Sequence, residues 1–167
     1  MLKFKIEQLA LCPRDPVAAR EMLSDLGLTD WYEDNVHAKG TVFGEDAENK
    51  ANLQFNYQTS SDDDVIRPNV LELEILHYTE GRSWTDWRGA GVSHLGMHVT
   101  EEQLKEFRDY FDKKNIGVAQ EVITQSHTNP VIKDSRRYKY VIFDTRRILG
   151  VDLKFIVRLH LDKQVTV

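Results

Sequence analysis

The stretch V-S-H-L-G-M-H-V, from Val92 to Val99, has the alternating pattern of a β-strand. Successive side chains of a strand point to opposite faces of the sheet, with a period of two residues. The leucine, the methionine and the second valine therefore share an apolar face, while His94, Gly96 and His98 share the opposite one. The pattern directs two histidines to one side of a sheet, and it makes this strand the centre of a candidate site.

The composition is that of an ordinary globular protein with one substantial core. Among 167 residues, 41% are hydrophobic and 29% are charged. No apolar run is long enough to span a bilayer, the first residues do not resemble a signal peptide, and the single cysteine, Cys12, cannot form an internal disulfide. We therefore expect a cytoplasmic protein that does not associate with membranes. The net charge of -5 argues against general affinity for nucleic acid.

The order of expected elements repeats once along the chain. In each half, a strand is followed by a helix and then by three further strands, with a period of about 80 residues. We predict one domain over residues 1–167, built from modules 1–88 and 89–167. The expected fold is α+β, in which two β-α-β-β-β modules form curved, mainly antiparallel sheets around a cleft.

Local signals mark the ends of several elements. The first helix is expected to start with Asp15 as N-cap, and the second with a capping box formed by Thr100 and Gln103. The polar stretch Gly44–Lys50 is expected to turn between two strands, and Ser60–Asp64 to be a solvated loop.

Polar side chains recur at matching places in the two modules. I-E-Q-L-A-L matches V-S-H-L-G-M, which puts Gln8 opposite His94, and L-E-L-E-I-L matches V-D-L-K-F-I, which puts Glu74 opposite Lys154. An ordinary half-solvated sheet alternates in the same way. The repetition of the polar positions nevertheless favours a shared cleft between the modules.

The chain resembles the vicinal oxygen chelate superfamily, which includes glyoxalase I, methylmalonyl-CoA epimerase, extradiol dioxygenases, and the bleomycin- and fosfomycin-resistance proteins. The resemblance covers essentially the whole chain. It rests on the doubled element order and on I-E-Q-L-A-L, L-E-L-E-I-L, V-S-H-L-G-M-H-V and D-T-R-R-I-L-G-V-D-L-K-F-I. In that family, four residues hold a divalent metal, which the substrate chelates through two neighbouring oxygens. Carried over by motif, the four positions are Gln8, Glu74, His94 and Lys154.

The resemblance implies a metal-dependent enzyme of lyase or isomerase type that acts on a small oxygenated molecule. Gln8, Glu74 and His94 match the ligand types of glyoxalase I and would hold Zn, Ni, Mn or Fe, with Glu74 also serving as the catalytic base. A ring-cleaving dioxygenase is disfavoured, because its iron site of two histidines and one carboxylate would need a histidine in place of Gln8. The family resemblance is also compatible with a homodimer.

Lys154 departs from the family pattern, because a protonated ammonium has no lone pair to give a cation. Three arrangements remain open. The metal is held by three residues and water, or Asp152 or His98 takes the fourth place, or no metal binds and Lys154 pairs with Glu74. The third arrangement implies a metal-free protein that binds or sequesters a small molecule, as the bleomycin-resistance proteins do.

Further residues are candidates for a substrate pocket. His98 is expected to line the pocket rather than to ligate a metal. His127 and Asn129 lie in a loop before Pro130, where a turn and a substrate contact are equally compatible with the sequence. The complete set of predicted pocket residues is His98, Asp152, Lys154, His127 and Asn129.

Overall fold

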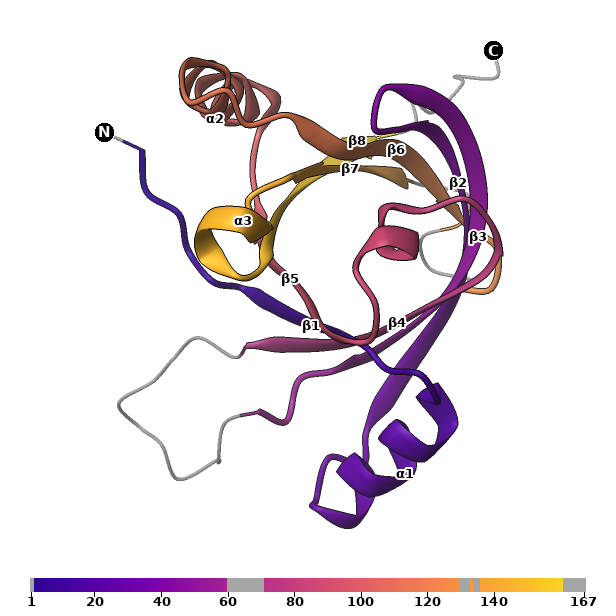
Figure 1. The fold of residues 1–167 in the computed structure, drawn as a ribbon. Coiled ribbons are helices and arrows are strands. Elements are labelled where there is room, and N and C mark those ends of the chain that lie inside the picture. The colour runs from indigo at the N-terminus through magenta and orange to yellow at the C-terminus, as the bar shows by residue number, and fades with distance from the viewer. Residues whose placement is uncertain (1, 60–70, 130–132, 134–135, 161–167) are drawn as a thin grey trace.

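The computed structural model describes residues 2–59, 71–129, 133 and 136–160 (Figure 1). The predicted loop Ser60–Asp64 lies outside these residues. The described elements follow the order β1 (Gln8–Cys12), α1 (Pro16–Asp25), β2 (Trp31–Val42), β3 (Glu45–Asn56), β4 (Glu72–Gly81), the 3-10 helix η1 (Trp84–Trp87), β5 (Gly91–His98), α2 (Glu101–Lys113), β6 (Val118–Ser126), β7 (Arg136–Phe143), α3 (Arg146–Leu149) and β8 (Asp152–His160). Among the described helices, none has the length and apolar character needed to cross a membrane.

The strands close into one barrel, in the order β1-β4-β3-β2-β6-β7-β8-β5 (Figure 1). The four strands of each module lie next to one another, and the antiparallel pairs β1–β5 and β2–β6 join the two halves. β1–β4 and β5–β8 run parallel, and the other neighbours are antiparallel. This confirms the predicted α+β fold with curved, mainly antiparallel sheets, and closure leaves no sheet edge between the halves.

The two parallel pairs have matching registers. Gln8 lies opposite Glu72 in the β1–β4 pair, and His94 lies opposite Asp152 in the β5–β8 pair. Duplicated modules would produce this correspondence. The internal repeat and the module boundary after residue 88 stay predictions.

Residues 45–50 belong to a strand, so the expectation of a turn over 44–50 is wrong for all of this stretch but Gly44. β3 begins at Glu45, and the turn from β2 consists of Phe43 and Gly44, both with positive φ (49° and 80°). A two-residue turn of this kind matches the twist of a hairpin. The stretch is polar because the outer face of β2 and β3 carries exposed charges such as Glu48, whose carboxylate lies 3.4 Å from the Lys39 ammonium.

The two long helices differ in how much they bury. α2 buries Leu104, Phe107 and Phe111 in a cluster with residues of β5, β7 and β8. Its predicted capping box is present, because Thr100 and Gln103 each accept a hydrogen bond from the backbone N–H of the other. α2 therefore seals the outer face of the second module's strands.

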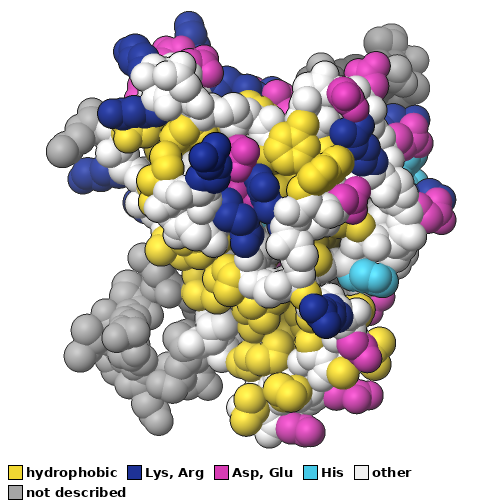
Figure 2. Space-filling model, viewed as in Figure 1, with side chains coloured by type: hydrophobic (Ala, Val, Ile, Leu, Met, Phe, Trp, Pro, Cys, Tyr) yellow, Lys and Arg dark blue, Asp and Glu magenta, His cyan; other side chains and the backbone are white. Residues whose placement is uncertain are grey.

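α1 begins after the predicted N-cap, but it buries less of its surface than α2 does. The Asp15 carboxylate accepts hydrogen bonds from the N–H groups of Val17 and Ala18, both at 3.0 Å. No residue of α1 is buried, and Met22 and Leu26 are 67% and 77% exposed. Figure 2 shows hydrophobic side chains at the surface over α1.

The difference between the helices predicts different costs of truncation. Leu104→Ala should lower the free energy of unfolding by about 2–5 kcal/mol, because it leaves a cavity under α2. Met22→Ala, at an exposed position of α1, should change it by less than about 0.5 kcal/mol. Urea unfolding of both variants, followed by circular dichroism, checks this. Equal losses would contradict the view that α2 seals the core.

Candidate functional site

The four positions predicted from the family's metal ligands meet inside the barrel. Gln8, Glu74, His94 and Lys154 come from β1, β4, β5 and β8, which are neighbours in the closed sheet. All four are buried, Glu74 and His94 completely. Strand alternation turns each of them to the inside, as it turns the apolar side chains between them to the outside. We call these four residues the interior tetrad.

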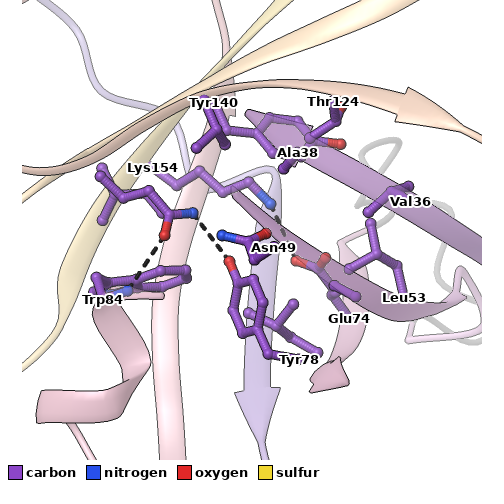
Figure 3. Close-up of a pocket in the computed structure, with 15 residues that line it drawn as sticks. Val36, Ala38, Asn49, Leu53, Glu74, Tyr78, Trp84, Thr124, Tyr140 and Lys154 are labelled. Atoms are coloured by element: carbon purple, nitrogen blue, oxygen red, sulfur yellow. Dashed lines mark hydrogen bonds and ion pairs between the residues drawn. The ribbon is translucent and has the colours of Figure 1, made fainter. Parts of the chain in front are cut away.

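The Glu74 carboxylate is the meeting point of two partners. The Lys154 ammonium lies 3.3 Å from Glu74 Oε2, and His94 Nε2 lies 3.2 Å from the same oxygen. Figure 3 shows Lys154 and Glu74 extending toward each other, with Tyr140 beside them. The ammonium also lies 4.2 Å from the centre of the Tyr140 ring, in cation–π geometry. Lys154 is thus held between a carboxylate and a ring face.

Gln8 links the tetrad to Glu72. Its amide nitrogen donates to one oxygen of the Glu72 carboxylate, and its Oε1 lies 2.9 Å from His94 Nε2. Only the nitrogen of the amide can donate to a carboxylate, so this bond fixes the orientation of Gln8 with the carbonyl oxygen toward His94. Tyr57 Oη donates to the other Glu72 oxygen at 2.6 Å.

The neighbours of His94 determine which nitrogen carries the proton. Nε2 faces two acceptors, Gln8 Oε1 and Glu74 Oε2, so the proton of the ring is on Nε2. Nδ1 lies 3.2 Å from Ser93 Oγ, a hydroxyl that can donate to it. Burial, and after it the positive charge of Lys154, lower the pKa of His94 to about 4. The imidazole is therefore neutral at pH 7.

Glu74 is ionised although it is buried. Burial by itself would raise the pKa of Glu74, but the Lys154 ammonium and the hydrogen bond with His94 outweigh it and bring the pKa to about 2. Glu74 and Lys154 therefore form a buried ion pair at neutral pH. A carboxylate with so low a pKa is a weak general base.

This arrangement does not fit a divalent metal. An ammonium stands beside the carboxylate that would be the strongest ligand, and the imidazole nitrogen facing the centre carries a proton. Within the described residues, no group of three or more His, Cys, Asp or Glu could hold a metal ion. The donor that remains is Glu74 Oε1, which is buried without a hydrogen-bond partner among the described residues. It lines a void of about 20 Å³, which has room for about one water-sized molecule.

Gly96 makes room for Gln8. A Cβ at this position would lie 2.8 Å from Gln8 Oε1 and 3.0 Å from Gln8 Cβ. The glycine in V-S-H-L-G-M-H-V thus leaves space on β5 for the Gln8 side chain of β1. The sequence placed Gly96 on the same face as the histidines, but its purpose depends on the neighbouring strand.

A larger cavity opens at the mouth of the barrel, at the end of the strands where β4 begins and β5 ends. It has a volume of about 490 Å³ and shares Val36, Leu53, Thr124 and Tyr140 with the small void beside Glu74. We call it the mouth cavity. Sequence reasoning missed its aromatic lining, although the parity of the strands points these side chains inward. The lining aromatic residues are Tyr32, Phe55, Tyr57, Tyr138 and Tyr140.

The opposite end of the barrel is covered by η1. Trp84 is buried and its indole lies 5.8 Å from the His94 ring, between centroids. Asp152 holds this end together, since its carboxylate accepts hydrogen bonds from Arg88 Nε at 2.8 Å and from Trp84 Nε1 at 3.2 Å. The structure thus places the predicted pocket residue Asp152 away from the mouth cavity, in a network that anchors η1. Figure 3 shows Trp84 against the small void beside Glu74.

The other predicted pocket residues divide between the mouth cavity and the outer surface. His98 and Asn129 line the mouth cavity. His98 Nδ1 lies 3.1 Å from a carboxylate oxygen of Glu7. His127 lies outside the cavity lining and stacks on His37, with 5.9 Å between ring centroids. The loop therefore brings Asn129 to the cavity and turns His127 away from it.

The fit of Gly96 against Gln8 predicts that this position does not accept a larger residue. Gly96→Ala should lower the free energy of unfolding by about 1–3 kcal/mol, because the new methyl group displaces the Gln8 amide. Gly117→Ala is the control, since a Cβ there meets nothing within 4 Å. Urea unfolding compares the two variants. Similar stability of the two would show that Gln8 adapts freely.

The neutral state of His94 predicts a dependence of stability on pH. The unfolded chain binds a proton at this residue below pH 6.5, whereas the folded protein does so only below about 4. Its contribution is therefore present above pH 6.5 and is lost as the pH falls toward 4, by at most about 1.4 kcal/mol per pH unit. His94→Gln keeps an N–H donor but cannot titrate. Urea unfolding at pH 7 and pH 5 should show a smaller loss in the variant, and parallel losses would refute the assignment.

Comparison with known proteins establishes the fold. No protein-family model and no curated protein sequence matches the chain. A solved structure of Streptomyces coelicolor methylmalonyl-CoA epimerase in complex with 2-nitronate-propionyl-CoA is similar, with a TM-score of 0.50, 12% identity, and coverage of 92% of this chain and 96% of that chain. A second structure of that epimerase with the same ligand gives a TM-score of 0.48 at 13% identity, with coverage of 92% and 96%. The first of these two likenesses shows that the chain shares the fold of that epimerase.

Proposed function

We propose that this protein is a metal-free small-molecule-binding protein in which the Lys154 ammonium replaces the cation that the family resemblance implies. One observation carries the proposal. The Lys154 ammonium lies 3.3 Å from Glu74 Oε2, and both side chains are buried inside the barrel. The positive charge that would balance the carboxylate is thus supplied by the chain itself.

The protonation states of the tetrad support this reading. A metal site for catalysis keeps an open coordination position and ligands with free lone pairs. Here Lys154 pairs with Glu74 Oε2, and His94 presents a proton toward the same oxygen and toward Gln8 Oε1. A buried ion pair is costly to form, but removal of one partner is costlier, because it leaves an uncompensated charge. The tetrad therefore forms the closed floor of the barrel interior.

The mouth cavity is the proposed place of the ligand. Its volume of about 490 Å³ lies within the range of small-molecule sites. It adjoins the tetrad through shared wall residues, so a ligand there would lie above the ion pair and outside it. The cytoplasmic location, the homodimer and the lack of affinity for nucleic acid stay predictions.

A metal-dependent lyase or isomerase is the second candidate. It is favoured by the meeting of Gln8, Glu74 and His94, the three ligand types of the glyoxalase resemblance, and by the unpartnered Oε1 of Glu74. This reading requires Lys154 to leave the carboxylate and His94 to move its proton to Nδ1. We give the metal-free function precedence because both requirements break contacts of the tetrad.

Added metal separates the two functions. The wild type, purified without a chelator, should contain no stoichiometric Zn, Ni, Mn or Fe, and its melting temperature should not respond to these metals. Lys154→Glu should be less stable than the wild type without metal, because it places two carboxylates together. It should gain stability when zinc or nickel binds the folded state. Metal analysis and thermal denaturation measure both effects.

An exposed lysine supplies the control for the change of charge. Lys105→Glu lies on the surface of α2 and should leave both the melting temperature and its indifference to metal nearly unchanged. A wild type that is stabilised by a divalent metal, with the effect lost in His94→Gln, would overturn the metal-free function and establish the second candidate.

A further inference from the structure

Tyrosines gather in two pairs around the mouth cavity. Tyr32 and Tyr57 pack edge to face with 5.9 Å between ring centroids, and Tyr138 and Tyr140 stack with 6.1 Å between centroids and 23° between planes. The pairs belong to separate walls, because β6 lies between β2 and β7 in the barrel. Tyr32 is 63% exposed, so its ring is open to solvent at the rim of the cavity. Two rigid ring pairs on separate walls suit a flat ligand that contacts both.

Glu72 is a preorganised negative charge in the same cavity. Its two oxygens accept separate hydrogen bonds, one from Gln8 Nε2 and one from Tyr57 Oη. These donors hold the carboxylate in place at the point where the tetrad meets the tyrosines. A charge that is already fixed can bind a ligand of opposite sign without losing much freedom.

Asp34 adds a second negative charge on the β2 wall. Asp34 is only 6% exposed, and it lines the mouth cavity. Ser126 Oγ and Thr128 Oγ1 both donate to Oδ1, at 2.6 and 3.1 Å. Among the described residues, neither of these two bonds occupies Oδ2.

Most of the positively charged groups around the cavity, among the described residues, are paired with a carboxylate. Lys154 lies beneath it and is paired with Glu74, and His98 stands beside the carboxylate of Glu7. Arg158 is the cation in the lining, and it is exposed to solvent, where screening weakens its effect. A third acid of the lining, Glu33, is paired with Arg20 at 3.3 Å outside the cavity. Among the described residues, the field at the tyrosines is therefore set mainly by Glu72 and Asp34.

We infer that the mouth cavity binds a planar organic cation, an aromatic ring system that carries a positive charge. This inference rests on the proposed function, in that it takes the mouth cavity as the ligand site. The tyrosine faces attract a cation through their quadrupoles, and the carboxylates attract it through their charge. Both forces act in the same direction, and both reject an anion of the same shape.

Three ligands of one shape and different charge test the inference. Calorimetric titration compares N-methylquinolinium, quinoline, which is neutral at pH 7.5, and naphthoate. N-Methylquinolinium should bind at least about tenfold more tightly than quinoline, and naphthoate more weakly than either. Equal or tighter binding of quinoline or naphthoate would overturn the inference, and so would the absence of saturable binding by all three.

Two cavity variants and two matched controls locate the binding. Glu72→Gln should reduce the preference for the cation to about threefold or less, and Tyr138→Leu should weaken the binding of quinoline and its cation alike. Glu80→Gln lies on the same strand as Glu72 but outside the cavity lining, and Tyr110→Leu lies on α2. Both controls should bind as the wild type does. If Glu72→Gln fails to fold, Asp34→Asn replaces it, because Asp34 is the other carboxylate that sets the field in the cavity. An undiminished preference for the cation in the cavity variants would refute the assignment.

The same titrations separate failure of this inference from failure of the proposed function. Binding of N-methylquinolinium that requires added zinc or nickel would overturn the metal-free function while leaving the ligand class in place. Tighter binding of naphthoate by a protein whose melting ignores metals would overturn the ligand class while leaving the metal-free function in place.

Discussion

The buried ion pair between Lys154 and Glu74 is the interaction on which the rest of the site depends. A carboxylate in the interior of a barrel is tolerated only with a compensating positive charge, and here the chain itself supplies it from the opposite module. The pair keeps Glu74 ionised, and its cation contributes to keeping His94 neutral. The neutral imidazole in turn directs its proton to Gln8, whose amide then donates to Glu72. The ion pair thus belongs to a continuous path of polar contacts that reaches the mouth cavity.

Closure of the barrel makes this pair possible and gives its two ends different characters. At one end, Trp84 covers the tetrad, and Asp152 holds this end together through its bonds with Trp84 and Arg88. At the other end, tyrosines and carboxylates remain open to solvent around the mouth cavity. Charge is therefore buried where it is fully paired, and it is accessible where a ligand can pair with it. The unpartnered Oε1 of Glu74 lies between the two ends, next to a void of about 20 Å³.

The two helices α1 and α2 cover the outside of the barrel to different extents. α2 contributes three buried side chains to the core of the second module, whereas α1 contributes none and leaves Met22 and Leu26 at the surface. The part of the outer face of β2 and β3 that carries Lys39, Glu48 and Lys50 needs no helix, because these side chains are charged and exposed. The second module therefore carries most of the apolar packing, and the first module carries more of the polar surface.

The sequence by itself determined those features that follow from local periodicity and local hydrogen bonds. Alternation in V-S-H-L-G-M-H-V and its matching motifs predicted the α+β fold and placed Gln8, Glu74, His94 and Lys154 on one face, and the caps at Asp15 and Thr100 located the helices. Only the tertiary structure decided which distant groups meet. Arg88 and Asp152 are 64 positions apart in the chain, and the tyrosine pairs of the mouth cavity belong to different modules. The period of a strand fixes the face of a side chain, but its partner and its protonation depend on which strands close the barrel, and no local pattern encodes that pairing.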